Sequence, residues 1–193
     1  MRFIKRTSIS VFLILSLLGV WSAQAATDSA KDVRLYTLNC GYIDVHDFSS
    51  FSDTNGYPHQ PRRLADPCFL IKHSKGWLLW DLGLGDQYLN RKVEVKKYGV
   101  TISVPISLTA QLKQLGLTPN DIKFVAISHS HFDHLGNANL FPNATWLVQR
   151  AEYKYTQQKP LPPGVADNAF QTLEKMHIKL LDGDYDVFGD GTV

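Results

Sequence analysis

A cluster of metal-binding side chains directly after a short apolar run is the feature that most constrains this chain. Four side chains within six residues can bind a metal, namely His129, His131, Asp133 and His134. The preceding residues 124–127 (Phe-Val-Ala-Ile) are wholly apolar, which predicts a strand covered on both faces. In α/β proteins, ligand sites lie at the carboxyl ends of strands. We therefore expect a metal site on the loop that follows this strand.

The spacing within the cluster predicts two neighbouring metal positions. In an extended loop, His129 and His131 project to the same side and can hold one metal through imidazole nitrogens at about 2.0–2.1 Å. Asp133 and His134 are adjacent, so they diverge unless the chain turns sharply, and a short helix expected from about Leu135 supplies that turn. Nitrogen and oxygen donors admit zinc, iron or manganese, and zinc is the expected metal.

The first 25 residues have the layout of a secretory signal peptide. Three basic residues precede an apolar run over residues 9–20, and Ala23-Gln24-Ala25 follows as a cleavage site. The run has about 12 residues, fewer than the roughly 20 that a membrane-spanning helix needs. We expect cleavage after Ala25, a secreted or periplasmic mature chain, and no stable membrane association of that chain.

Removal of this segment changes the charge of the protein. The whole chain carries 20 Lys and Arg against 18 Asp and Glu, a formal net charge of +2. Three of the basic residues lie in the predicted signal peptide, so the mature chain has a formal charge of −1. No basic run marks a nucleic-acid surface, so we expect a small-molecule partner and no nucleic acid. The oligomeric state is not specified by the sequence.

Strands and helices alternate in the remainder of the chain, which favours an α/β domain over residues 33–193 after a linker at 26–32. The expected strands span residues 33–39 (ended by Gly41), 68–72, 77–80, 124–127, 146–148 and 178–181. A hairpin turn is expected at 73–76, and helical segments at 108–115, after an N-cap at Ser107, and at 152–155.

The sequence leaves two pairs of alternatives open. Cys40 and Cys68 are expected in an oxidising compartment, where disulfides persist, but each also lies beside apolar residues as a small buried hydrophobe does. Residues 44–67 are predicted to form a long loop, whose aromatic side chains either wall a substrate pocket or fix the loop to the core. These side chains are Phe48, Phe51 and Tyr57. The isolated His46, His59, His73 and His177 are interpreted as surface or structural residues.

The spacing His-x-His-x-Asp-His resembles the signature of the metallo-β-lactamase superfamily of binuclear hydrolases, which have an αββα fold. Residues 81–83 (Asp-Leu-Gly), after a predicted strand, resemble the first motif of that family. The stretch from Leu64 to Asp81 is similar to the N-acyl homoserine lactonase branch. The resemblance therefore implies a hydrolase of the quorum-quenching lactonase type, and the predicted signal peptide implies that it is exported.

The resemblance also implies roles for individual residues. His129 and His131 would bind the first metal, and Asp133 and His134 the second. A metal-activated hydroxide would attack a lactone or related ester carbonyl. Asp133 would act as the catalytic proton carrier, and Asp81 would hold a ligand histidine from behind. The alternatives are a β-lactamase or thioester hydrolase of the same superfamily, and an inactive, truncated metal-binding remnant.

The family's full ligand set is larger than the one in this sequence. It includes a third histidine, a bridging carboxylate and a last histidine. After His134 this chain has only His177, whose neighbours do not resemble the family's Gly-His motif. The four aspartates within residues 182–190 are predicted to form a solvated turn. We expect residues 33–193 to be the N-terminal half to two-thirds of an αββα domain, with its C-terminal part missing.

Overall fold

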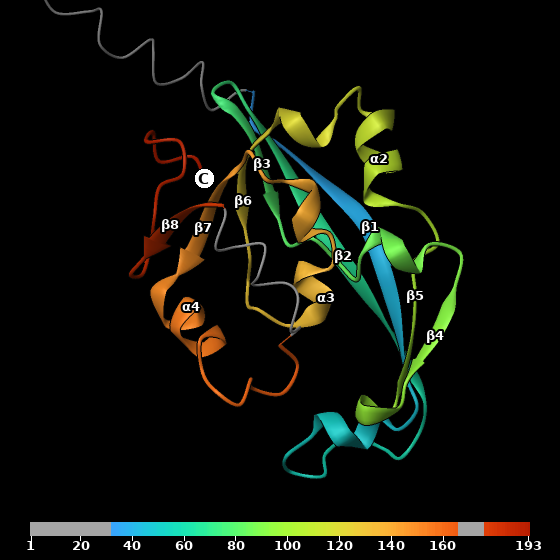
Figure 1. Ribbon diagram of the computed structural model, residues 1–193. Coiled ribbons are helices and arrows are strands. Elements are labelled where there is room, and N and C mark those ends of the chain that lie inside the picture. The colour runs from blue at the N-terminus through green and yellow to red at the C-terminus, as the bar shows by residue number, and fades with distance from the viewer. Residues whose placement is uncertain (1–31, 166–175) are drawn as a thin grey trace, which may run out of the picture.

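The computed structural model describes residues 32–165 and 176–193 (Figure 1). The predicted signal peptide and all of the predicted linker except Asp32 lie outside these residues. Within the described ranges the strands form one eight-stranded sheet in the order β4-β5-β1-β2-β3-β6-β7-β8. No helix in the same ranges is long and apolar enough to cross a membrane.

The sheet has an antiparallel half and a parallel half. The antiparallel half contains β1 (Arg34–Val45), β2 (Arg62–His73), β3 (Gly76–Trp80), β4 (Lys92–Val95) and β5 (Val100–Ser103). Beyond β3 the strands run parallel, as β6 (Ile122–Ala126), β7 (Thr145–Gln149) and β8 (His177–Leu181). The predicted hairpin is confirmed, because β2 and β3 pair across their short turn.

Among the described residues, three α-helices and several single 3-10 turns connect the strands. The α-helices are α2 (Leu108–Gln114), α3 (Phe132–Leu135) and α4 (Arg150–Thr156). The 3-10 turns are η2 (Phe48–Phe51), η3 (Asp86–Tyr88), η4 (Lys96–Tyr98), η5 (Pro119–Asp121) and η6 (Ala138–Leu140). The predicted cap of α2 is confirmed, since the Ser107 side chain accepts a hydrogen bond from the Ala110 amide.

Side-chain alternation along the strands gives the sheet two different faces. On one face Leu79 and Trp146 pack with Leu112 of α2 and Leu135 of α3 in the largest apolar cluster, and Tyr153 of α4 packs against it. The opposite face carries a smaller cluster, in which strand residues pack against the C-terminal segment. Its buried members are Leu78, Ala126, Leu147 and Phe188. The helices therefore cover one face of the sheet, the side from which the candidate site is built.

The structure corrects the predicted boundaries around the long loop. β1 does not end at Gly41, because the register shifts between Asn39 and Tyr42 and the strand continues as a bulge. Gly41 has φ 149°, and its amide donates to the Asn39 side chain. Pro67 lies opposite Asn39 at this irregularity, where a missing backbone donor is tolerated. The loop is therefore shorter than predicted and spans residues 46–61.

The cysteine alternatives are resolved in favour of a disulfide between Cys40 and Cys68. Both residues are also fully buried, so the bond lies inside the main apolar cluster. It joins β1 to β2 directly beneath the chain that follows β3. A Cβ built on Gly83 would lie 2.2 Å from the Cβ of Cys40, so the two segments are in close contact there.

The aromatic residues of the loop pack mainly on one another. The Phe48 ring stacks on Phe51 and on Tyr57, with centroids 5.6 Å and 4.7 Å apart. Phe48 also packs against a buried cluster on the β4–β5 side of the sheet, whereas the other two rings stay largely exposed. This packing supports the interpretation that Phe48 fixes the loop to the core.

The C-terminal turn was expected to be solvated, and that expectation is wrong for Asp190. Its carboxylate lies 3.1 Å from the Nε2 atom of His73, which is fully buried. The His73 ring stacks on Phe188 at 4.0 Å, so His73 is structural, as interpreted.

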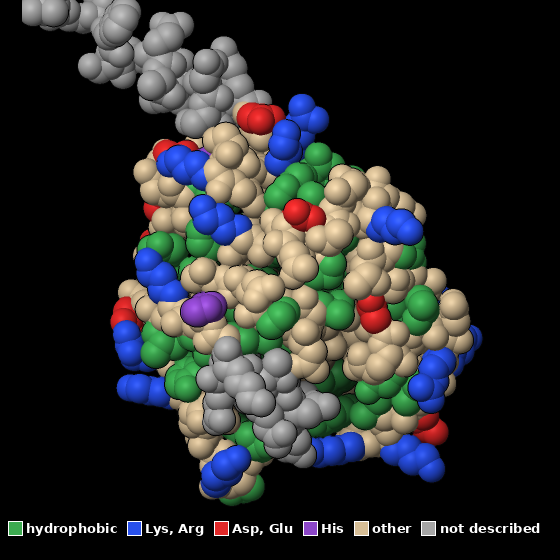
Figure 2. All heavy atoms as spheres, turned by 45° about the horizontal axis from the view of Figure 1, so that its top comes forward, with side chains coloured by type: hydrophobic (Ala, Val, Ile, Leu, Met, Phe, Trp, Pro, Cys, Tyr) green, Lys and Arg blue, Asp and Glu red, His purple; other side chains and the backbone are tan. Residues whose placement is uncertain are grey.

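On the face shown in Figure 2, Lys and Arg side chains are spread around the periphery and do not form one patch.

Candidate metal centre

The candidate site lies at the carboxyl ends of two adjacent parallel strands, β3 and β6. β3 ends at Trp80 and β6 ends at Ala126, and these two residues are paired in register. Asp81 follows in the left-handed region with φ 60°, a conformation that aspartate tolerates better than most residues. Its amide still donates to the Ala126 carbonyl at 2.9 Å. The sharp turn brings the Asp81 side chain beside the loop that follows β6.

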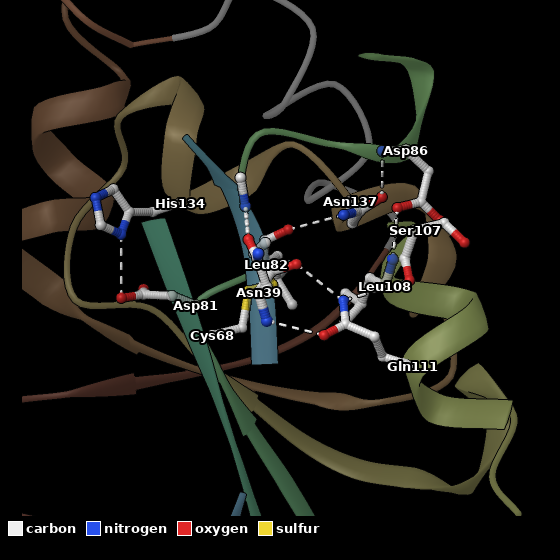
Figure 3. The surroundings of a disulfide bond; sticks show 12 residues. Asn39, Cys68, Asp81, Leu82, Asp86, Ser107, Leu108, Gln111, His134 and Asn137 are labelled. Carbon is white, nitrogen blue, oxygen red and sulfur yellow. Dashed lines mark hydrogen bonds and ion pairs between the residues drawn. A yellow bond between two sulfur atoms is a disulfide. The ribbon is translucent and has the colours of Figure 1, made fainter. Parts of the chain in front are cut away.

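The Asp81 carboxylate links the two strand ends to the metal-binding cluster. One oxygen accepts a hydrogen bond from the Ser128 amide at 2.8 Å, and the other lies 3.0 Å from the Nδ1 atom of His134 (Figure 3). Asp81 is almost fully buried. This is the geometry in which a carboxylate fixes the orientation and tautomer of a ligand histidine.

The cluster itself comes together compactly. Donor atoms of His129, Asp133 and His134 all lie within 4.8 Å of one another. The His129 ring centroid is 4.1 Å from that of His134 and 4.5 Å from that of His131. This donor group takes His129 from the first predicted pair together with both residues of the second pair, and the His131 ring adjoins His129.

The helix at the cluster was expected from about Leu135, but α3 ends at that residue, and only the 3-10 turn η6 follows it. α3 starts at Phe132, so Asp133 and His134 lie within its first turn and not before it. The reason is a tertiary contact, since the Phe132 amide donates to the carbonyl of Gly164 at 3.0 Å. The same segment packs on His131, where a Cβ built on Gly164 would lie 2.6 Å from the imidazole ring.

A close crossing of two backbones holds the cluster loop against the chain after β3. The Gly136 amide donates to Gly83 at 2.7 Å, and the Leu82 amide donates to the carbonyl of His134 at 3.0 Å. A Cβ on Gly136 would lie 2.1 Å from the Leu84 backbone, so only glycine fits at this crossing. The crossing fixes the first turn of α3 relative to Asp81.

The surroundings of His129 and His134 shift their pKa values in opposite directions. Burial lowers the pKa of His129, and the neighbouring His134 and His131 lower it further. Burial also acts to lower the pKa of His134, but the hydrogen bond to Asp81 and the charge of Asp133 outweigh it and raise the pKa above its usual value.

Asp66 is a further acidic residue of the site that sequence reasoning missed. It lies on β2, is only 5% exposed, and its Oδ2 atom is buried without a hydrogen-bond partner among the described residues. Burial, and next the charge of Asp133, raise the pKa of Asp66 to about 7. The only sequence signal is an aspartate within a strand, which by itself does not indicate a site.

These residues fit a divalent metal. Two imidazoles and one carboxylate within reach of one another are the donor types that zinc prefers. The unpartnered oxygen of Asp66 beside them supports the fit, because a buried carboxylate is normally compensated by a hydrogen bond or a cation. His131 lies next to this donor set and offers one more nitrogen.

Sequence comparison with known proteins indicates the family that the spacing of the cluster resembles. A sequence profile described as "Metallo-beta-lactamase superfamily" matches residues 62–188. The N-acyl homoserine lactonase AttM of Azorhizobium caulinodans is 32% identical over 184 residues, covering 84% of this chain and 65% of the relative. AttM of Agrobacterium fabrum gives the same identity and coverage. This chain therefore spans somewhat less than two thirds of the length of these relatives.

Solved structures show the corresponding fold. A structure described as a quorum-quenching N-acyl homoserine lactone hydrolase matches with a TM-score of 0.65 and 26% identity, over 79% of this chain and 59% of the other. A second, with the product N-hexanoyl-L-homoserine at its catalytic metal center, matches with the same TM-score and identity over 79% and 61%. The fold is thus the predicted α/β arrangement, and the chain belongs to the metallo-β-lactamase superfamily.

Proposed function

We propose that this protein is an exported metal-dependent hydrolase that opens a lactone or a related ester, as its N-acyl homoserine lactonase relatives are named for doing. The observation that carries the proposal is the group of His129, Asp133 and His134 donors with Asp81 behind it. Divalent metals, with zinc proposed first, would supply an acidified water as nucleophile and a Lewis acid for the carbonyl oxygen.

The chain's own residues prepare the ligands for this role. With the His134 Nδ1 proton donated to Asp81, the Nε2 lone pair is free to bind a metal. The Nδ1 atom of His129 lies 3.0 Å from the Ser128 hydroxyl, which leaves its Nε2 atom as the donor. Asp133 and His131 complete the proposed ligand set, with His129 and His131 for one metal and Asp133 and His134 for the other.

Asp133 is the proposed proton carrier. Its Oδ2 atom lies 3.5 Å from His134 Nε2, and about a fifth of its side chain is exposed, so it adjoins both the metal position and solvent. Water adds to the lactone carbonyl carbon and the bond to the ring oxygen breaks. Asp133 takes the proton from the attacking water and delivers it to that ring oxygen, which leaves an open-chain hydroxy acid.

Export to the periplasm or the medium is part of the proposal. The Cys40–Cys68 disulfide supports it, because such bonds persist in oxidising compartments. The signal-like pattern of residues 1–25 supports it independently. Determining the N-terminal sequence of protein from a periplasmic fraction tests it, with Ala26 as the expected first residue and Met1 as the contradicting result.

Proton release in weakly buffered zinc-containing solution tests the activity. We expect turnover of N-hexanoyl homoserine lactone by the chain and none by the variant His129→Ala. Hydrolysis of nitrocefin or of a thioester, without lactone opening, would replace the lactonase proposal by one of the other superfamily activities. Zinc stoichiometry is measured alongside, and a folded chain that binds none at micromolar zinc would contradict the enzyme and identify a remnant without turnover.

A further inference from the structure

We infer that Glu152 is a positioning residue for the first half of the metal-binding cluster, acting through Ser130. This inference rests on the proposed metal centre and assigns a role to a helix that the sequence motif does not include. Glu152 lies in the first turn of α4, about twenty residues after the cluster in sequence.

Ser130 is the residue between the first two histidines of the cluster. Its side chain is fully buried, and both of its donors go to one acceptor. The Ser130 amide donates to Glu152 Oε1 at 2.8 Å, and the Ser130 hydroxyl donates to the same oxygen. Hydrogen bonds to an ionised acceptor are stronger than those between neutral groups.

This contact fixes the segment that carries the two rings. In an extended segment, alternate side chains project to opposite sides, so a Ser130 side chain bound to Glu152 directs His129 and His131 to the other side. Their ring centroids are 4.5 Å apart, close enough to serve one site. Without Glu152, the buried amide and hydroxyl of Ser130 would lose their shared partner and the segment could rotate to find others.

α4 is itself held at both sides, so Glu152 is presented from a fixed element. The Tyr153 ring packs against the main apolar cluster, and Arg150 makes a paired contact with Asp182, its Nε atom 2.9 Å from Oδ1 and a terminal nitrogen 2.9 Å from Oδ2. Supporting residues of this kind typically change metal affinity by about 10–100-fold when they are removed. Glu152 would therefore act on affinity without touching metal or substrate.

Zinc affinity, measured by competition with a chromophoric chelator, tests the inference. Glu152→Ala is expected to weaken zinc binding about 10–100-fold. Glu152→Gln is expected to stay within about 3-fold of the parent, because its amide oxygen still accepts both hydrogen bonds. Lys154→Ala, at an exposed position of the same helix, is the control and should not change the affinity. Thermal unfolding in EDTA reports stability separately.

A folded Glu152→Ala chain with the parent zinc affinity would overturn the inference. Should that variant fail to fold, Glu152→Asp keeps the charge but withdraws the carboxylate by one methylene from Ser130. The same loss of affinity is expected, and a folded Glu152→Asp chain with full affinity would also overturn it. A parent chain that binds zinc but opens no lactone would contradict the proposed function and leave this inference standing.

Discussion

The two halves of the metal-binding cluster are fixed in different ways. The first half, with His129 and His131, is held by its backbone, because Glu152 binds the intervening Ser130. The second half is held by a side chain, because Asp81 binds the His134 ring directly. A backbone anchor sets where rings lie, whereas a ring anchor sets which nitrogen carries the proton. Substitutions in the two halves should therefore impair metal binding in different ways.

The halves also differ in charge. Asp81 and Asp133 lie directly beside His134, and Asp66 is close enough to influence the pKa of His134, so three carboxylates surround the second half. In the first half, Asp133 and Asp81 also act on His129, but burial and the neighbouring imidazoles outweigh them and lower its pKa. The supporting carboxylate of this half, Glu152, already accepts two hydrogen bonds from Ser130. The second half should therefore depend more on a bound cation to balance its negative charge. The first half should depend more on the position of its backbone.

The largest effect is expected where the cluster crosses the chain after β3. Gly136→Ala places a methyl group 2.1 Å from the Leu84 backbone, and no flexible side chain can yield there. We expect a loss of zinc affinity above 100-fold and a free energy of unfolding lower by about 3 kcal/mol or more. Chelator competition and chemical denaturation measure the two quantities.

Gly56→Ala is the matched control for this substitution. Its nearest neighbours would be serine and threonine hydroxyls of an exposed loop at 3.4 Å or more, so neither quantity should change. Parent-like zinc binding by Gly136→Ala would show that the two loops can separate without loss of the site, and that the second half does not depend on β3.

The disulfide lies next to Gly83, in the chain segment that carries Asp81, so its removal should act mainly on the second half. Replacing Cys40 and Cys68 by serine opens a link across 28 residues, and the free energy of unfolding should fall by about 3–4 kcal/mol. Because Cys40 contacts Gly83 beside the Asp81 turn, zinc affinity should fall as well. Denaturation with and without a reductant measures this, and the reductant should not affect the serine variant. An unchanged midpoint on reduction of the parent would contradict the expectation.

The sequence predicts the parts of this architecture that are encoded locally. Three features can be recognised because each combines a residue type with a nearby pattern: the cluster, the apolar strand before it, and Asp81 at the end of β3. The hairpin and the capped helix α2 are local in the same sense, and both are confirmed.

The parts that depend on distant contacts could not be predicted. Asp66 belongs to the site only because β2 passes beneath it, and Glu152 because α4 packs back against the cluster loop. The early start of α3 depends on the Gly164 carbonyl, about thirty residues later. The strand end predicted at Gly41 is wrong, because a glycine alone does not distinguish a strand end from a bulge. The difference lies in how the strand pairs with Pro67 and its neighbours.

The substitution Asp81→Asn tests the contact that holds the His134 ring, for comparison with the contact by which Glu152 holds the Ser130 backbone. The amide can still accept from the Ser128 amide through its oxygen, but it then turns an NH2 group toward His134 Nδ1 and disfavours the tautomer that frees Nε2. Zinc affinity should fall about 10–100-fold, or about 1.4–2.7 kcal/mol, with little loss of stability in EDTA. Asp44→Asn, on β1 and paired with Arg63, is the control. Unchanged affinity would remove Asp81 from the site.

The smallest expected effect tests the charge asymmetry through Asp66 in the metal-free chain. Burial raises the pKa of Asp66 to about 7 from 3.8, so the folded chain holds this proton more tightly than the unfolded chain. The unfolded chain loses the proton near pH 4 and the folded chain near pH 7, so this group lowers the free energy of unfolding as pH rises between them, and the effect levels off above pH 7. Asp66→Asn removes the titration. Its advantage over the parent should grow by about 2.6 kcal/mol from pH 5 to pH 8 in denaturation measured with EDTA. Parallel stability curves for the two chains would mean that the second half tolerates a third charge without a cation, and that it is no more demanding of a metal than the first.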